Sequence, residues 1–205
     1  MRALILVDIQ NDFLPGGALA VPRGDEVVPL ANRAQQEFAL VVATQDWHPR
    51  DHGSFASLHP GRSPGELAEL AGLPQVLWPD HCVQGTHGAA FAGGLDMNRV
   101  EAIFRKGTDP RIDSYSGFFD NGHRKSTGLA DYLRGRGASE VHVIGLATDY
   151  CVKFTALDAL ELGFRTFIHL DGTRGVELQP GDVDRAVQEL RAAGVQVLRG
   201  TTPGP

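Results

Sequence analysis

The sequence has few cysteines, no block of positive charge and no long apolar run. Cys82 and Cys151 are the two cysteines among 205 residues, which argues against a disulfide framework and suits a reducing compartment. The net charge of −6, without a Lys/Arg cluster, argues against nucleic-acid or anionic-membrane partners. No apolar stretch approaches the roughly 18 residues of a membrane span, and the short apolar start lacks a signal-peptide cleavage site. We therefore expect a cytoplasmic protein, either a monomer or a homo-oligomer.

Short apolar runs alternate with helical patterns along the chain. The runs LILV and LVVAT are continuously apolar, as in strands that helices cover on both faces. Strand–helix–strand order implies right-handed crossovers and a mostly parallel sheet of about six strands, hence a three-layer α/β/α sandwich in one domain, 1–205. The predicted strands are 2–7, 39–44, 102–105, 140–146, 165–170 and 195–198, and the predicted helices are 25–38, 128–136, 149–162 and 182–193.

Two long segments, 46–94 and 107–126, interrupt this alternation. Segments of that length in a compact domain are usually functional or disordered, and the aromatic and histidine content of these two favours function. In an open parallel sheet, ligands bind beyond the carboxyl ends of the strands. Four chemically useful side chains lie just past predicted strands: Asp8, Asp46, Lys106 and Cys151. The sequence therefore predicts an active site at that edge of the sheet.

Three of these side chains make sense as a catalytic set. Cys151 follows a short turn after strand 140–146, so we expect it near a helix N-terminus, which favours the thiolate. Asp8 can take the thiol proton and return it to a leaving amine, while the nearby Lys106 ammonium keeps that carboxylate ionised and stabilises the thiolate. Taken singly, each residue is as easily a core cysteine, a turn aspartate or a surface lysine.

The turn before Cys151 could serve acyl transfer. Backbone N–H groups of Ala147 and Cys151 are candidate oxyanion donors, and Gly145 would ease the tight geometry. Thr148 or Asp149 is the expected N-cap of the helix that follows.

The segment 46–94 is also predicted to be a metal-binding insertion. Asp46 and His48 lie two residues apart, so an extended backbone would point both to one side, and His81 returns 33 residues after His48. One carboxylate and two or three imidazoles suit Zn²⁺ first, with Fe²⁺ or Mn²⁺ as alternatives. His52 is an uncertain further ligand because a Pro-containing turn leaves its direction open, and Cys82 is expected to pack in the core.

In this order and spacing, five segments resemble nicotinamidases of the isochorismatase-like hydrolase superfamily: DIQNDF, TQDWHPRDH, WPDHCVQGT, FRKG and GLATDYCV. The resemblance spans residues 8–155. The second and third segments are typical of its metal-containing branch.

This resemblance implies a nicotinamide amidohydrolase of NAD salvage that also accepts pyrazinamide, with one divalent metal ion. It implies that Cys151 is the nucleophile, Asp8 the general base and acid, and Lys106 the third catalytic member. Asp46, His48 and His81 match the metal ligands, whereas His52 matches a histidine that ligates in some members only.

The same resemblance assigns further residues around the substrate. Phe13 and Trp78 match aromatic walls around the substrate ring. Ala147 matches an oxyanion donor preceded by a cis peptide bond.

Two rival functions stay open at this point. A metal-independent amidase of the same superfamily, acting on a carbamoyl or ureido compound, would not need Asp46, His48 and His81. A non-catalytic binding protein whose metal staples the long loop would not need the Cys/Asp/Lys set.

Overall fold

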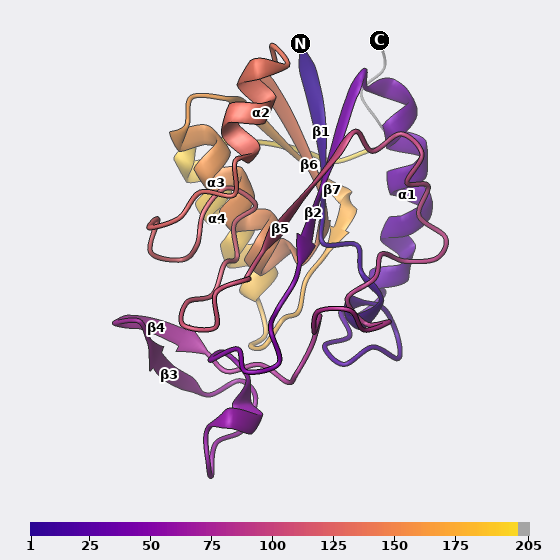
Figure 1. Cartoon of the computed structure of the whole chain (residues 1–205). Helices are drawn as coiled ribbons and strands as arrows, with labels where there is room; N and C mark the ends of the chain where they lie inside the picture. The colour runs from indigo at the N-terminus through magenta and orange to yellow at the C-terminus, as the bar shows by residue number, and fades with distance from the viewer. Residues whose placement is uncertain (201–205) are drawn as a thin grey trace.

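A six-stranded parallel sheet forms the centre of the molecule (Figure 1). The computed structural model describes residues 1–200. The strand order is β5-β2-β1-β6-β7-β8, and all neighbours are parallel. Its strands are β1 (Arg2–Val7), β2 (Leu40–Asp46), β5 (Ala102–Lys106), β6 (Glu140–Leu146), β7 (Arg165–Arg174) and β8 (Gln196–Leu198).

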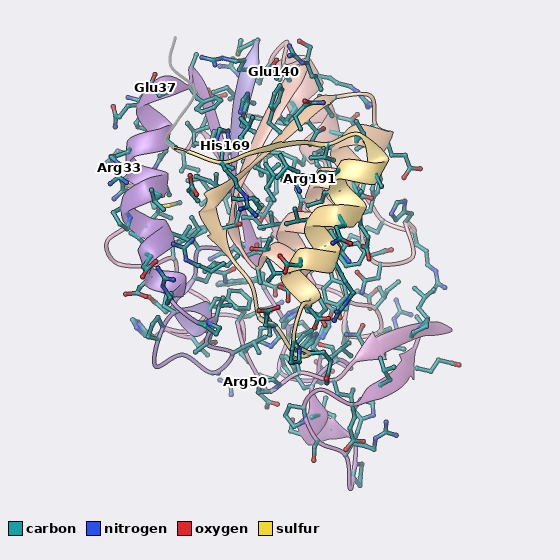
Figure 2. The ribbon with its side chains drawn as sticks, turned by 180° about the vertical axis from the view of Figure 1, so that it is seen from behind. Arg33, Glu37, Arg50, Glu140, His169 and Arg191 are labelled. Atoms are coloured by element: carbon teal, nitrogen blue, oxygen red, sulfur yellow. The ribbon has the colours of Figure 1, made fainter. Side chains whose placement is uncertain are left out.

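Helices cover both faces of this sheet. One face carries α1 (Val27–Ala34), and the other carries α2 (Leu129–Gly135), α3 (Lys153–Glu161) and α4 (Asp182–Ala193). Figure 2, seen from behind, shows α4 with Arg191 on one side and α1 with Arg33 on the other. The predicted three-layer sandwich is confirmed. Within residues 1–200, no helix is long and apolar enough to cross a bilayer.

Each face of the sheet buries its own apolar core. Alternate residues of β1 point to opposite faces, so Ile5 and Val7 pack towards α2, α3 and α4, whereas Leu4 and Leu6 pack towards α1. All four are fully buried. Burial on both faces explains why the strand sequences are continuously apolar rather than alternating.

The predicted helix 25–38 is shorter in the structure. Its α-helical part is α1, flanked by 3₁₀ turns at Gly24–Glu26 and Gln35–Glu37. Pro29 lies in the first turn of α1, where its missing N–H costs no intrahelical hydrogen bond.

The long segment 46–94 contains a hairpin that the sequence reading did not predict. Strands β3 (Leu67–Leu70) and β4 (Leu73–Val76) pair antiparallel and project below the main sheet in Figure 1. They are joined by Ala71 and Gly72, both with positive φ, as a two-residue hairpin turn requires. The β3 sequence, LAEL, does not alternate apolar and polar residues, so hydrophobic periodicity did not indicate this strand.

Gly145 allows β6 to pass close to β1 just before the Cys151 turn. Its φ is +127°, and a Cβ at this position would lie 2.1 Å from the carbonyl oxygen of Val7. The register of β6 against β7 also shifts between Val143 and Gly145. The glycine is therefore required by a steric contact as well as by its dihedral angle.

We expect Gly145→Ala to lower the free energy of unfolding by about 2–4 kcal/mol, because the new methyl group clashes with backbone and φ is unfavourable for alanine. Chemical denaturation measures this difference. Gly135→Ala is the matched control: it lies in α2, with nothing within 4 Å of the added Cβ. That control should be neutral or stabilising by up to about 1 kcal/mol. Equal effects of the two substitutions would contradict the steric argument.

Candidate active site

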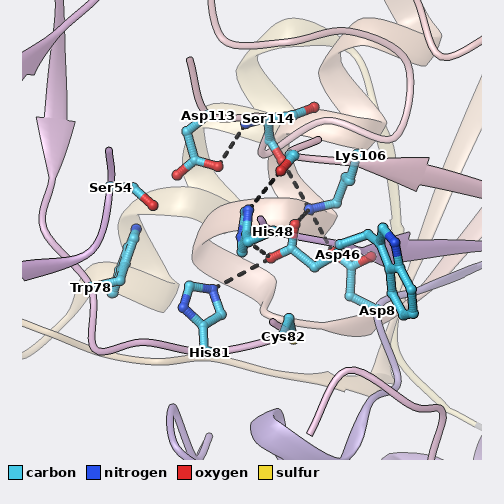
Figure 3. A network of polar contacts seen from close by, with 12 residues as sticks. Asp8, Asp46, His48, Ser54, Trp78, His81, Cys82, Lys106, Asp113 and Ser114 are labelled. Carbon is cyan, nitrogen blue, oxygen red and sulfur yellow. Dashed lines mark hydrogen bonds and ion pairs between the residues drawn. The ribbon is translucent and has the colours of Figure 1, made fainter. Parts of the chain in front are cut away.

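Four neighbouring strands bring the predicted polar residues to one edge of the sheet. Asp8 directly follows β1, Asp46 ends β2, Lys106 ends β5, and Cys151 lies in the turn after β6. All four side chains are buried. Figure 3 shows Asp8, Asp46 and Lys106 together with the neighbouring histidines.

The ammonium of Lys106 is the centre of the polar cluster. Its Nζ lies 2.9 Å from Asp8 Oδ2 and 3.0 Å from Asp46 Oδ1. It also donates to the carbonyl oxygen of Ser114 at 2.9 Å and lies 3.4 Å from Cys151 Sγ. Asp8 Oδ1 accepts a further hydrogen bond from the Thr44 hydroxyl at 2.6 Å. The predicted Cys/Asp/Lys set is thus in contact.

The charges in this cluster favour an ionised lysine and an ionised Asp46. Burial opposes the charge of Lys106, but Asp46, Asp8 and Cys151 together raise its pKa well above the usual value. Burial likewise opposes ionisation of Asp46, yet His48 and Lys106 outweigh it and lower the Asp46 pKa well below its usual range. The ion pair between these two side chains is therefore stable in its charged form.

Asp8 and Cys151 behave in the opposite way. Burial raises the pKa of Asp8, and the negative charge of Asp46 adds to this while Lys106 opposes it. Burial also raises the pKa of Cys151 well above the usual value, and Asp8 and Asp46 reinforce the rise against Lys106. Burial therefore opposes both the ionised Asp8 and the Cys151 thiolate that the sequence led us to expect.

Cys151 lies in a turn of unusual geometry. The Leu146–Ala147 peptide bond is cis, as the sequence resemblance implied. A five-residue π-helical turn, Thr148–Val152, then precedes α3. The Ala147 carbonyl accepts the N–H groups of Tyr150 and Val152, both at 3.1 Å, which wraps the chain tightly around the turn.

Neither Thr148 nor Asp149 caps this helix, so the predicted N-cap is wrong. No side-chain capping bond is present at the start of the π turn or of α3. The Asp149 carboxylate instead accepts backbone N–H groups from Val176 and Glu177, which are distant in sequence.

Asp46, His48 and His81 converge next to Lys106 with ligand atoms suited to a metal ion. Their ligand atoms lie within 4.8 Å of one another. Asp46 Oδ2 lies 3.1 Å from His48 Nε2 and 3.5 Å from His81 Nε2. The Nδ1–H groups are directed at backbone carbonyls, Gly107 for His48 and Pro79 for His81.

This hydrogen bonding leaves both Nε2 atoms facing a carboxylate oxygen. A lone pair on each nitrogen would repel that oxygen unless protons or a cation lie between them. The Asp46 charge accordingly raises the pKa of His48 against the effect of burial. Histidines that bind zinc through Nε2 commonly donate Nδ1–H to a backbone carbonyl, and both His48 and His81 make that hydrogen bond. The donor set therefore fits a divalent cation.

His52 lies beside this group rather than within it. Its ring centroid is 4.2 Å from that of His48, and its Nδ1 contacts the Ser54 hydroxyl at 2.7 Å. Its Nε2 is buried without a hydrogen-bond partner among the described residues. Burial, followed by the charge of His48, lowers the His52 pKa to about 4. His52 forms an overlapping candidate ligand group with His48 and Asp113, a residue not singled out from the sequence.

Cys82 belongs to the apolar core on the α1 side of the sheet, in agreement with the packing prediction. Burial raises the pKa of its thiol well above the usual value, so it is held as a neutral thiol.

A cavity lined by polar and aromatic side chains opens onto these groups. Cys151, Ala147, Asp46 and His81 line it, and so do both predicted aromatic walls, Phe13 and Trp78. The sequence reading missed five lining residues: Leu19, Asp113, Tyr115, Tyr150 and Val176. Asp113 and Tyr115 come from the segment 107–126, whose length was the one signal available for them. Apolar and aromatic walls with a few polar groups between them are typical of a site for a small ligand.

Comparisons with known proteins agree with this geometry. The family model described as the isochorismatase domain matches residues 2–202. A nicotinamidase of Escherichia coli strain K12 is 54% identical over 197 residues, covering 94% of this chain and 92% of that protein. A structure described as an Acinetobacter baumanii nicotinamidase and pyrazinamidase is 46% identical, with a TM-score of 0.94 and coverage of 97% and 95% of the two chains.

A pyrazinamidase of Pyrococcus horikoshii, solved in complex with zinc, is 40% identical, with a TM-score of 0.80 and coverage of 97% of this chain and 99% of that one. The family model spans nearly the whole chain, and the relatives named above align with this chain over nearly their full length. The chain therefore belongs to the isochorismatase family.

Proposed function

We propose that this protein is a nicotinamidase, which hydrolyses nicotinamide to nicotinate and ammonia in NAD salvage and also accepts pyrazinamide. One observation carries the proposal: Lys106 joins the cysteine–aspartate pair to the Asp46–His48–His81 group. Cys151, Asp46 and His81 of this joined set line the cavity. The named relatives, a nicotinamidase and two pyrazinamidases, support the same substrate class.

In the first half-reaction, the sulfur of Cys151 attacks the amide carbonyl carbon. Asp8 takes the thiol proton as the S–C bond forms, since burial has raised the proton affinity of its carboxylate. The developing oxyanion lies against the backbone N–H groups of Ala147 and Cys151. Asp8 then gives its proton to the amide nitrogen, the C–N bond breaks, and ammonia departs. The acyl group remains bonded to the sulfur of Cys151 as a thioester.

In the second half-reaction, water attacks the thioester carbon while Asp8 takes one of its protons. The S–C bond breaks, and the sulfur of Cys151 recovers the proton from Asp8. Nicotinic acid is released and ionises. Lys106 remains charged throughout, because two carboxylates raise its pKa well above the usual value.

Asp46, His48 and His81 would hold one divalent ion, with Zn²⁺ favoured and Fe²⁺ or Mn²⁺ as alternatives. When bound, this ion supplies a Lewis acid that orients the pyridine ring and withdraws electrons from it. Gly107 and Pro79 carbonyls fix the two histidine rings. We treat residues 46–94 as the metal-binding insertion of a single catalytic domain.

Phe13 and Trp78 would hold the substrate ring between them. We place the enzyme in the cytoplasm, because its two cysteines are both unpaired and buried, which suits a reducing compartment.

The direct test of the proposal measures ammonia and nicotinate release from nicotinamide, with and without chelator treatment. We expect turnover that falls at least about tenfold on metal removal and returns when Zn²⁺ is added. An N-carbamoyl amino acid should not be hydrolysed. Turnover of that compound alone, unaffected by the chelator, would identify the metal-independent amidase instead.

Cys151→Ala should reduce nicotinamide turnover by roughly 10⁴-fold or more, because no covalent intermediate can form. Its metal content, measured by plasma mass spectrometry, should match wild type. Cys82→Ala is the matched control, since it removes the other buried thiol outside the substrate cavity. Retained turnover in Cys151→Ala would remove the thiol from the mechanism.

His48→Gln and His81→Gln should each lower bound metal from about one ion per chain to a small fraction of that, since loss of one of three ligands weakens the site at least about 100-fold. Metal analysis and Zn²⁺ titration calorimetry measure this without reference to activity. His87→Gln changes an exposed histidine in the same segment and should leave metal content unchanged. Full occupancy in both ligand variants would show that the ligand assignment is wrong.

A further inference from the structure

Asp149 precedes the nucleophile by two residues, yet it has no part in the chemistry described above. Its side chain is buried, and it does not line the substrate cavity, although Tyr150 and Cys151 do. Both carboxylate oxygens accept backbone hydrogen bonds: Val176 N–H donates to Oδ1 at 2.9 Å, and Glu177 N–H donates to Oδ2 at 2.8 Å. One carboxylate thus holds two consecutive peptide groups of the loop after β7.

The loop held in this way supplies a wall of the cavity. Val176 lines the substrate cavity together with Ala147, Tyr150 and Cys151. Behind it, Gly175 fits closely between two elements: a Cβ there would lie 2.1 Å from Val183 of α4 and 3.2 Å from Asp149 Oδ1. A larger residue at position 175 would push Val176 out of place.

The far side of the loop is also fixed. Glu177 has a φ of +53°, and its Oε1 accepts the N–H of Gly181 at 2.9 Å just before α4. The loop is therefore bonded to the turn that carries Cys151 on one side and to the start of α4 on the other. The first of these attachments depends on Asp149.

We infer that Asp149 is a positioning residue that holds Val176 against the substrate ring and thereby sets substrate affinity and the size of ring accepted. Two backbone N–H groups donate to this one carboxylate, and such charge-assisted hydrogen bonds are stronger than neutral ones. An asparagine would have the same shape but one acceptor oxygen, and its NH₂ group would face a backbone donor. This inference rests on nicotinamide hydrolysis as the activity of the site.

The test compares Asp149→Asn with wild type in steady-state kinetics and in amide hydrogen exchange. We expect KM for nicotinamide to rise about tenfold while kcat changes less than about threefold, since the variant loosens a binding wall and leaves the reacting groups in place. Exchange of the Val176 and Glu177 amides should accelerate. Asp184→Asn, an exposed carboxylate in α4, is the control and should leave all three values unchanged.

A second variant tests the wall itself. Val176→Ala should raise KM and increase the relative kcat/KM for at least one ring-methylated nicotinamide by about tenfold, because a methyl group of pocket space is worth about that much discrimination. This variant keeps the Asp149 hydrogen bonds, so it is informative even if Asp149→Asn does not fold.

Three results would overturn the inference. One is an unchanged KM in Asp149→Asn, and another is a fall in kcat alone, which would place the effect on the Cys151 turn. The third is an unchanged ranking of ring-methylated substrates in Val176→Ala. If the wild-type protein released no ammonia from nicotinamide, the proposed function would fail, and the exchange measurement would still report whether Asp149 holds the loop.

Discussion

The buried ammonium of Lys106 is the interaction on which the rest of the site depends. A buried charge without a partner costs several kcal/mol, and this one is balanced by Asp8, Asp46 and a backbone carbonyl. Without it, two carboxylates would lie close together in an apolar interior and one would take up a proton. Lys106 therefore allows Asp8 and Asp46 to be neighbours while keeping different proton affinities, as the roles proposed for these two carboxylates require.

The strand order explains how these groups meet. Along the sheet, β5, β2, β1 and β6 are consecutive, so their carboxyl ends present Lys106, Asp46, Asp8 and Cys151 in that spatial order. Lys106 and Asp46 are direct register partners. Parallel strands lie roughly 4.8 Å apart, and a lysine side chain is long enough to reach past one strand to the next. The crossovers place Asp8 and Cys151, which are separated by 143 positions, just beyond the carboxyl ends of the adjacent strands β1 and β6.

Loops complete what the strands begin. The segment 46–94 brings His81 and Trp78 over the sheet edge, and the segment 107–126 brings the Ser114 carbonyl and Tyr115 from the other side. Trp78 Nε1–H donates to the Tyr115 hydroxyl at 3.2 Å, so the two loops are bonded to each other across the cavity. The loop after β7, held by Asp149, adds a further wall. The sheet therefore fixes the positions of the Asp8, Lys106 and Cys151 side chains, and the loops determine the shape of the cavity.

The sequence by itself determined the six strands of the main sheet, the burial of that sheet on both faces and the residues that follow each strand, because apolar periodicity and turn chemistry are local properties of the chain. Its motifs also gave the family and the type of chemistry. Tertiary structure alone decided that Lys106 contacts both Asp8 and Asp46, that burial raises the pKa of the Cys151 thiol, and that Asp149 binds a distant loop rather than capping its own helix. Those outcomes depend on burial and on charges brought together by packing, which no local pattern contains.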